Sequence, residues 1–516
     1  MTDLTRPRWR RASRVLLLTV IYVVASAHVG NPDAWYEGPA GPYRVTVQVQ
    51  MPGVVPGVAR IFVRVSGSTP SRVTVFANKF DATGGAPPPE IAQPVTGSPG
   101  LYAAKLWLMA GGSNSVNVGV TGSRGSGSVV VPVLNIASRR LELDRKMGAG
   151  LAVMGAFLFI GLVTIVGAAA RESTLAPGEE PVRRRYSSAR IAMTFASLLL
   201  ALTLFGGWKW WTSEDNTFAR SLFKPLDAEA KLTDSPAARE LQFRITDSSW
   251  SNRGDTLWLQ RHRTNAWTPL IADHGKLMHL FLIREDLAAM AHLHPSTKDS
   301  VLFPSFLPPL PAGRYRVFAD IVHESGFSQT LVTKVDVPAV PSRAVSLTDP
   351  DDSWFVGSPR PGQRMSTLAD GSTMTWAGRA TPLVAGREAG LVFEIRNSDG
   401  SRATLEPYLG MAAHAVVARN DGSVFVHLHP LGTISIASQM AFELRQPGDT
   451  IRGKLGKRIA AGMSAMPAVS GSSAVSFPFA FPKEGKYRVW VQVRKDGRIL
   501  TAAFDASVAP GVTPAA

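Results

Sequence analysis

Residues 277–295 read LMHLFLIREDLAAMAHLHP, and residues 412–430 read AAHAVVARNDGSVFVHLHP. In the second stretch, Asn420-Asp421-Gly422 is a strong turn signal between alternating apolar residues, which is typical of a β-hairpin. The two stretches share the spacing of their histidines, so we expect the first to form the same hairpin. These residues therefore predict a duplicated β module.

Six of the ten histidines of the chain fall in these two stretches. Pairing about the middle of each turn places the lone histidine opposite the first histidine of the HLHP tetrapeptide, that is, His279 opposite His292 and His414 opposite His427. Side chains two residues apart on a strand share a face. Each hairpin then presents three histidines on one face: His279, His292 and His294 in the first, and His414, His427 and His429 in the second.

Three imidazoles in this arrangement can bind one metal ion. Directly opposed Cβ atoms on paired strands lie about 5 Å apart, and imidazole nitrogens bind transition metals at about 2 Å. Imidazole suits copper, zinc and nickel, whereas thioether favours Cu(I). Met463 and Met466 lie in a predicted Gly-rich loop that could close over the second site. We therefore expect copper first and zinc second, with purely structural histidines as the alternative.

Three other histidines carry weaker signals. His28 would be the first residue after cleavage at Ala25-Ser26-Ala27, and a mature N-terminal histidine can bind copper through its amine and its ring. Residues 29–146 hold no second histidine to complete such a site. His274 and His323 are further candidates, but a lone histidine is more often hydrogen-bonded or solvated than a ligand.

The N-terminus has the features of an export signal. Residues 1–27 combine an arginine-rich start, an apolar stretch and a small-residue cleavage site, which indicates a signal peptide or a signal anchor. Residues 147–170 and 191–211 are apolar enough to span a membrane, and the loop 171–190 between them is rich in arginine. The positive-inside rule places this loop in the cytoplasm. We expect a two-span protein of the bacterial inner membrane with large periplasmic parts.

Composition excludes several classes of function. The formal net charge is +16, but no basic stripe with interleaved aromatic residues supports nucleic-acid binding. The chain has no cysteine, which removes disulfides, thiolate metal sites and cysteine catalysis. No common motif of a hydrolase, zinc protease or nucleotide-binding protein is present. Any metal would have to be held by histidine, methionine, carboxylate or backbone oxygen.

The outer parts read as three β domains. Short alternating strands at roughly ten-residue spacing predict a β-sandwich over residues 28–146. Residues 212–340 and 388–516 form the two repeats, joined by a predicted linker at 341–387. Beyond the histidines, Gly313-Arg-Tyr315 in the first repeat matches Gly485-Lys-Tyr487 in the second. A Gly-x-Tyr that enters a late strand is similar to the tyrosine corner of immunoglobulin-like sandwiches.

An export signal, small β domains and His/Met clusters without cysteine together resemble bacterial periplasmic copper-resistance and metal-handling proteins of the CopC-like or YtkA-like kind. The phrases HGKLMHLFLIREDLAAMAHLHP and GKYRVWVQV resemble periplasmic domains found beside heavy-metal transport systems. The resemblance covers mainly residues 240–508 and implies an immunoglobulin-like fold and copper. The chain departs from small soluble carriers by its two spans and three β domains.

Three functions remain open at this point. The first is a membrane-tethered periplasmic protein that holds copper or passes it to a metal transporter or an oxidase. The second is a structural or interaction protein whose immunoglobulin-like domains bind an envelope partner and whose histidines belong to the core. The third is a copper-dependent enzyme of the oxidase type.

Overall fold

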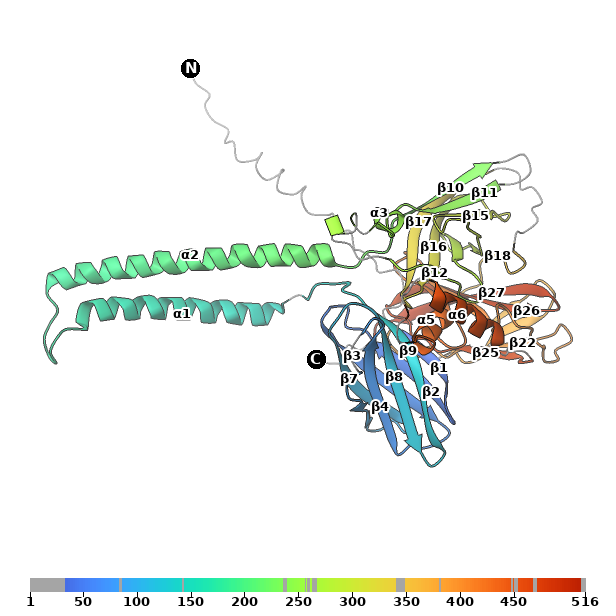
Figure 1. Cartoon of the computed structure of the whole chain (residues 1–516), viewed down its shortest axis with the longest axis horizontal. Helices are drawn as coiled ribbons and strands as arrows, with labels where there is room; N and C mark the ends of the chain where they lie inside the picture. The colour runs from blue at the N-terminus through green and yellow to red at the C-terminus, as the bar shows by residue number, and fades with distance from the viewer. Residues whose placement is uncertain are drawn as a thin grey trace, which may run out of the picture.

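The computed structural model describes residues 33–511, apart from residues 83–85, 142, 235–238, 256, 258–259, 262–266, 340–348, 380–381, 447–448, 450–452 and 467–470. The signal segment 1–27 and His28 lie outside the described residues. Three β domains gather at one end of a long helical hairpin (Figure 1). The expected fold class, mainly β with immunoglobulin-like sandwiches and a two-helix hairpin, is confirmed.

The first domain is a sandwich of two antiparallel sheets. One sheet has the order β1 (Ala34–Ala40), β2 (Tyr43–Gln50), β3 (Gly57–Ser66), β7 (Leu101–Leu108) and β6 (Gln93–Pro94). The other has the order β5 (Glu90–Ile91), β4 (Arg72–Lys79), β8 (Gly112–Gly122) and β9 (Gly125–Asn135). Alternate residues of β2, β3 and β8 are buried, so the inward valines fill the space between the sheets.

The helical hairpin comprises α1 (Arg145–Glu172) and α2 (Arg183–Ser221). Both helices are long and apolar enough to cross a membrane, and their apolar side chains are exposed along most of their length. Asp144 caps α1 by accepting hydrogen bonds from the amides of Lys146 and Met147. Both helices extend past the predicted spans, and α2 takes up the arginines of residues 183–190 from the predicted loop.

The first module has one sheet of β10 (Ala228–Asp234), β11 (Arg239–Ile245) and β15 (Leu302–Phe306), with the short helix α3 (Ser248–Ser251) beside it. The other sheet has the order β12 (Leu270–Ile271), β16 (Gly313–His323), β13 (His279–Arg284), β14 (Ala289–Leu293) and β18 (Ser353–Val356), and β17 (Ser328–Val337) also pairs with β16.

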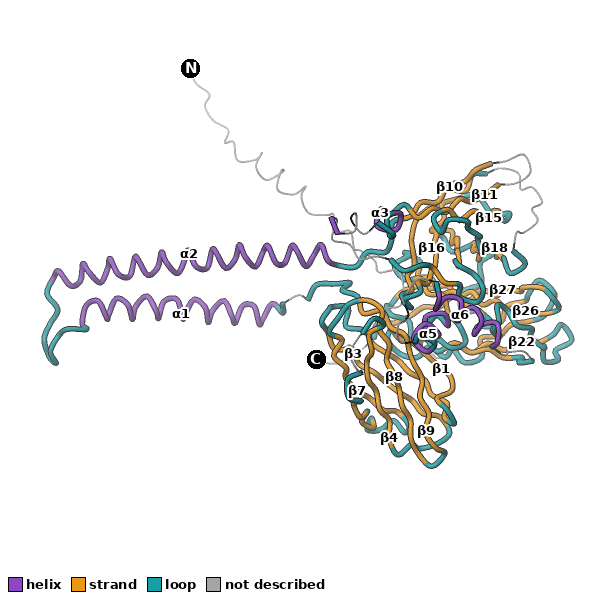
Figure 2. Tube along the Cα trace, in the orientation of Figure 1, coloured by secondary structure: helices purple, strands orange, loops and turns teal. Residues whose placement is uncertain are grey.

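The second module repeats this plan. One sheet has the order β19 (Met365–Thr367), β20 (Thr373–Trp376), β22 (Leu391–Arg396) and β25 (Ala474–Phe477). The other has the order β21 (Leu383–Val384), β27 (Arg498–Ala509), β26 (Gly485–Lys495), β23 (His414–Arg419) and β24 (Phe425–Leu428). Helices α5 (Ile436–Glu443) and α6 (Lys454–Ala465) lie between β24 and β25. Figure 2 shows that helix is otherwise almost confined to the long hairpin.

The tyrosine corner occurs in both modules. The Tyr315 hydroxyl donates to the carbonyl of Pro311 at 2.7 Å, and the Tyr487 hydroxyl donates to the carbonyl of Lys483 at the same distance. Gly313 and Gly485, which begin β16 and β26, both have positive φ angles, of 145° and 128°. The matched Gly-x-Tyr elements therefore perform the same structural role in the two repeats.

The predicted linker at 341–387 contributes strands to both modules. β18 extends the sheet of the first module through its pairing with β14. Leu368, Trp376 and Leu383 belong to the core of the second module. The Pro, Ser and Gly content of the segment predicted a linker, because its short strands form only by pairing with partners distant in the sequence.

The two modules pack sheet against sheet. Strands β13 and β23 are buried on both faces, because one face covers the core of its own module and the other meets the partner module. Phe318 and Phe425 stack across this contact, with ring centroids 4.2 Å apart and planes 6° from parallel. Phe281 and Trp490 complete the apolar contact. A continuous apolar run such as Leu280–Ile283 is typical of a strand buried on both faces.

The first sandwich docks on the segment that follows His429. The Glu37 amide donates to the Leu431 carbonyl at 2.8 Å, and the Thr433 amide donates to the Trp35 carbonyl at 3.1 Å. The Ile434 side chain is buried in the core of the sandwich. The three β domains therefore meet beside the HLHP strand of the second module.

Candidate metal centre

Seven histidines lie in one buried cluster at the contact between the modules. They are the six histidines of the two hairpins and His274, whose ring centroids lie 4.5–6.4 Å from their neighbours. The six hairpin histidines are at most 9% exposed. The expectation of one separate site per hairpin therefore gives way to one shared cluster, because the sheets that carry the histidines face each other.

The register of both hairpins differs by two residues from the predicted one. His292 pairs with Phe281 rather than with His279, and His427 pairs with Val416 rather than with His414. The turns close later along the chain, with Leu287 and Gly422 at positive φ. A shift of two residues preserves the face on which each side chain lies. The three histidines of each hairpin consequently remain together.

Polar residues of each module hold a histidine of the other module. The Gln492 side-chain oxygen lies 2.9 Å from His292 Nδ1, and an Asp320 carboxylate oxygen lies 3.5 Å from His427 Nδ1. Gln492 pairs with His414 across β23 and β26, whereas Asp320 pairs with His279 across β13 and β16. The two contacts are reciprocal, because Asp320 and Gln492 occupy equivalent positions in the two modules.

Three further histidines have one ring nitrogen anchored. His279 Nε2 lies 3.2 Å from the Asp273 carbonyl, and His429 Nδ1 lies 3.2 Å from the Ile434 carbonyl. His294 Nδ1 lies 3.1 Å from a carboxylate oxygen of Asp352. A carbonyl can only accept, so these contacts place the proton of His279 and His429 on the anchored nitrogen. Such outer hydrogen bonds are what orient metal-binding histidines.

Many of the opposite ring nitrogens have no hydrogen-bond partner. Among the described residues these buried atoms are Nε2 of His274, His294, His427 and His429, and both ring nitrogens of His414. His279 Nδ1 and His292 Nε2 face each other at 3.2 Å. The other nitrogen of His292, Nδ1, lies 2.9 Å from the Gln492 side chain, which also contacts Ser353. Buried polar groups without partners are rare, and a cation would satisfy this cluster.

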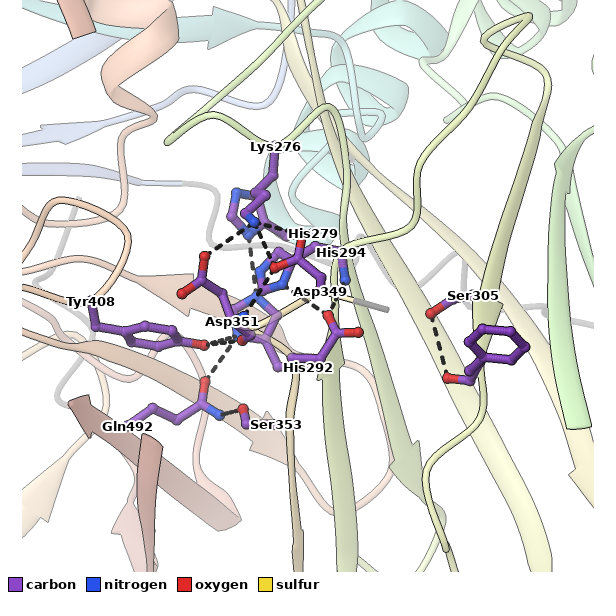
Figure 3. A network of polar contacts seen from close by, with 12 residues as sticks. Lys276, His279, His292, His294, Ser305, Asp349, Asp351, Ser353, Tyr408 and Gln492 are labelled. Carbon is purple, nitrogen blue, oxygen red and sulfur yellow. Dashed lines mark hydrogen bonds and ion pairs between the residues drawn. The ribbon is translucent and has the colours of Figure 1, made fainter. Parts of the chain in front are cut away.

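The histidines form two groups of three ligands. Ring nitrogens of His279, His292 and His427 lie within 4.8 Å of one another, as do those of His274, His414 and His429. Each group combines histidines from both modules. His294 forms a third group with Asp349 and Asp352. Figure 3 shows Lys276 beside this third group, where its ammonium lies 2.6 Å from Asp349 and 3.1 Å from Asp351.

Burial keeps the imidazoles neutral. It lowers the pKa of His279, His292 and His429 to about 3, and it holds the pKa of His294, His414 and His427 well below the ordinary value. Burial has the opposite effect on acids and raises the pKa of Asp320 and Asp352 to about 7. Neutral imidazole is the form that binds metal, so the six hairpin histidines are in the ligating state at neutral pH.

The methionines do not lie as predicted. Residues 454–465 form helix α6 rather than a Gly-rich loop, and Met463 packs in an apolar cluster with Ile459 and Ala441. Met466 ends this helix and is 43% exposed. Leu455, Ile459 and Met463 recur every four residues, which is the spacing of an amphipathic helix. Within the described residues, the three-ligand groups are made of histidine and aspartate, and His28 lies outside those residues.

His323 is a structural histidine. Its Nδ1 lies 3.0 Å from the Thr268 carbonyl, and its Nε2 lies 2.8 Å from the Gln329 side-chain amide. The ring also stacks on Trp267 with centroids 5.0 Å apart. Both nitrogens are satisfied, in contrast to those of the cluster. His274, which was a weak candidate from its sequence, belongs to the cluster.

Sequence reasoning missed the residues that anchor the histidines. Asp320 and Gln492 each follow the aligned glycine, Gly313 or Gly485, by seven residues. Extending the alignment of the two repeats by these positions would have paired them. Asp352 lies in the predicted linker, and no local pattern connects it to His294.

Comparisons with known proteins give one family match. A model described as a domain of unknown function, DUF8832, matches residues 238–339 and 366–510, which correspond to the two modules. A comparison with curated proteins finds no match.

Three solved structures show a weak likeness to this chain. The ICAM-5 D1–D4 ectodomain fragment has a TM-score of 0.15 at 8% identity, over 91% of this chain and 78% of that chain. Dimeric latent PorU from Porphyromonas gingivalis has a TM-score of 0.13 at 10% identity, over 93% and 34%. A protein from Corynebacterium diphtheriae described as membrane anchored has a TM-score of 0.15 at 8% identity, over 92% and 94%.

Proposed function

We propose that this protein is a membrane-tethered, periplasmic metal-binding protein that holds a transition metal in the histidine cluster between its two modules. The observation that supports the proposal most strongly is the set of buried imidazole nitrogens without partners. Leaving a polar atom buried and unsatisfied costs about 1–3 kcal/mol. Six such atoms in one cluster would be a heavy cost for a purely structural core, whereas a bound cation would offset it.

Copper is the metal we propose first, and zinc the second. Imidazole suits both metals, and among divalent ions of the first transition row Cu(II) binds nitrogen sites most tightly. The support from methionine is lost, because Met463 lies in an apolar cluster and Met466 is exposed. The preference therefore rests on the histidines alone. A structural zinc site usually has four ligands, whereas each histidine group here offers three.

The tether consists of the two apolar helices. We propose that they cross the bacterial inner membrane and that all three β domains lie in the periplasm. The arginines at 183–190, at the far end of the hairpin from the β domains, support this orientation through the positive-inside rule (Figure 1). A membrane-bound metal transporter or oxidase is the class of partner that such a tether favours.

The test is metal binding by the full chain in lipid nanodiscs, without a His-tag. Metal-free protein is dialysed against buffered Cu(II) or Zn(II), and bound metal is measured by elemental analysis. We expect one or two equivalents, and loss of binding in the His279→Ala/His414→Ala variant, which removes one ligand from each group. His323→Gln is the matched control, because His323 is equally buried but has both nitrogens hydrogen-bonded. Absence of metal from the wild type would make the histidines structural and overturn the proposal.

A further inference from the structure

A cavity of about 210 Å³ lies where the three β domains meet. The first sandwich supplies one wall, through Asp33, Met51 and residues 132–134, and the two modules supply the others. Ser138 and Phe223 also line the cavity. These residues belong to the segments that lead into α1 and out of α2, so the cavity lies on the side of the β domains that faces the helical hairpin.

The cavity reaches the histidine cluster. His279, His427 and His429 line it. The side chain of His427 is 6% exposed, and both His427 Nε2 and His429 Nε2 lack a hydrogen-bond partner. The cavity therefore ends at histidine rings from both of the three-histidine groups.

The two sides of the cluster differ in charge and exposure. Gln492, a neutral amide, is fully buried and hydrogen-bonded to His292 and Ser353. Its equivalent Asp320 is a carboxyl whose side chain is 24% exposed, and it lines the cavity. Thr330 donates to Asp320 and also lines the cavity, so the carboxyl is held in position at the wall. The reciprocal arrangement is thus closed on one side and open to the cavity on the other.

We propose that this cavity is the entrance for a divalent cation, and that Asp320 binds the arriving cation and passes it to His427. The inference rests on the proposed metal function and adds the route. A carboxyl group at the wall offers an arriving cation an oxygen ligand and, when ionised, a negative charge. Asp320 lies 3.5 Å from His427 Nδ1, so an ion at the carboxyl group lies beside the ring whose other nitrogen, Nε2, has no hydrogen-bond partner.

Lys276 also lines the cavity, but it does not oppose a cation strongly. Its ammonium lies 2.6 Å from both carboxylate oxygens of Asp349 and 3.1 Å from Asp351. Two carboxylates therefore surround one positive charge. Asp273 lines the same cavity and adds a further acidic side chain near the histidines. The charged groups at the wall consequently favour a cation over an anion.

The experiment measures the rate of metal uptake by the full chain in nanodiscs, with stopped-flow mixing of metal-free protein and buffered Cu(II). We expect Asp320→Asn to slow uptake about tenfold, at the lower end of the rate effects that charged clefts produce, and equilibrium binding is measured beside it because Asp320 also contacts His427. Asp320→Glu keeps the carboxyl group and should take up metal at close to the wild-type rate. Asp336→Asn is the matched control, because Asp336 is an exposed aspartate of the adjacent strand β17 that pairs with Arg314.

A second variant tests the route without changing charge. Ser328 lines the cavity, and Ser328→Phe should fill part of it and slow both uptake and release. If Asp320→Asn and Ser328→Phe both take up metal at the wild-type rate, the cavity is not the entrance, although the metal function stands. If the wild type binds no metal, the proposed function fails, and this inference fails with it. Near-UV circular dichroism identifies any variant that has lost its fold.

Discussion

Acidification should open the metal-free contact between the modules between about pH 5 and 6. Seven buried histidines have a pKa lowered by burial: His279, His292, His294, His323, His414, His427 and His429. In the unfolded chain a histidine titrates near 6.5. Below that pH the unfolded chain binds protons at histidines that stay neutral in the folded protein, so the free energy of unfolding falls as the pH falls.

Four carboxyl groups act in the opposite direction. Burial raises the pKa of Asp33 to about 6, the pKa of Asp320 and Asp352 to about 7, and the pKa of Glu443 above its ordinary value. The folded protein therefore binds these protons before the unfolded chain does, which stabilises the fold as the pH falls. Near pH 5.5 the histidines outweigh the carboxyls by roughly three protons, or about 4 kcal/mol per pH unit. Domains are commonly stable by only about 5–15 kcal/mol, so one unit of pH removes a large share of the total.

The assay is urea unfolding of the full chain in nanodiscs at a series of pH values from 7.5 to 5, followed by near-UV circular dichroism. Metal-free protein should lose stability steeply below pH 6.5. Saturation with Cu(II) should shift the loss to lower pH, because bound metal competes with protons for the same nitrogens. A slope below about 1.4 kcal/mol per pH unit, the contribution of a single group, would refute the assignment of a buried neutral cluster.

Two other predictions follow from the same geometry. Replacing His414, His427 and His429 together with Ala should abolish metal binding rather than halve it, because these residues belong to both three-histidine groups. If elemental analysis still finds half of the metal, each hairpin binds metal independently and the shared site is refuted. Replacing Tyr315 or Tyr487 with Phe should lower the free energy of unfolding by about 1 kcal/mol in each case, since each change removes one hydrogen bond to a backbone carbonyl; urea titration measures the loss, and equal values for the two variants would show that the corners are equivalent.

The repeat, the sandwiches and the helical hairpin follow from local patterns in the sequence. Alternating residues predicted the strands, and the spacing of Gly313 and Tyr315 against Gly485 and Tyr487 predicted matched corners. The short strands within residues 353–384 could not be found in this way. β18 and β21 have no periodicity of their own and form because β14 and β27 offer them pairing partners.

The histidine positions were predictable, but their grouping was not. Parity along a strand fixes the face of each histidine, so a register error of two residues left that prediction intact. The pattern does not say what covers that face. The continuous apolar run Leu280–Ile283 was the available signal, because a strand of a free-standing module needs only one apolar face. Phe281 and Ile283 indicate a second packing surface on this strand, but they do not identify the sheet that covers it.

The divergence between the two copies makes the two sides of the histidine cluster unequal. Packing two equivalent sheets face to face creates reciprocal contacts, such as those of Gln492 with His292 and of Asp320 with His427. Identical copies would give two identical sides. Here the longer connection after β24 carries α5 and the segment that docks on the first sandwich, and the cavity forms on that side. The open side carries the carboxyl and the closed side the amide, which is the distribution expected if a cation enters from one direction.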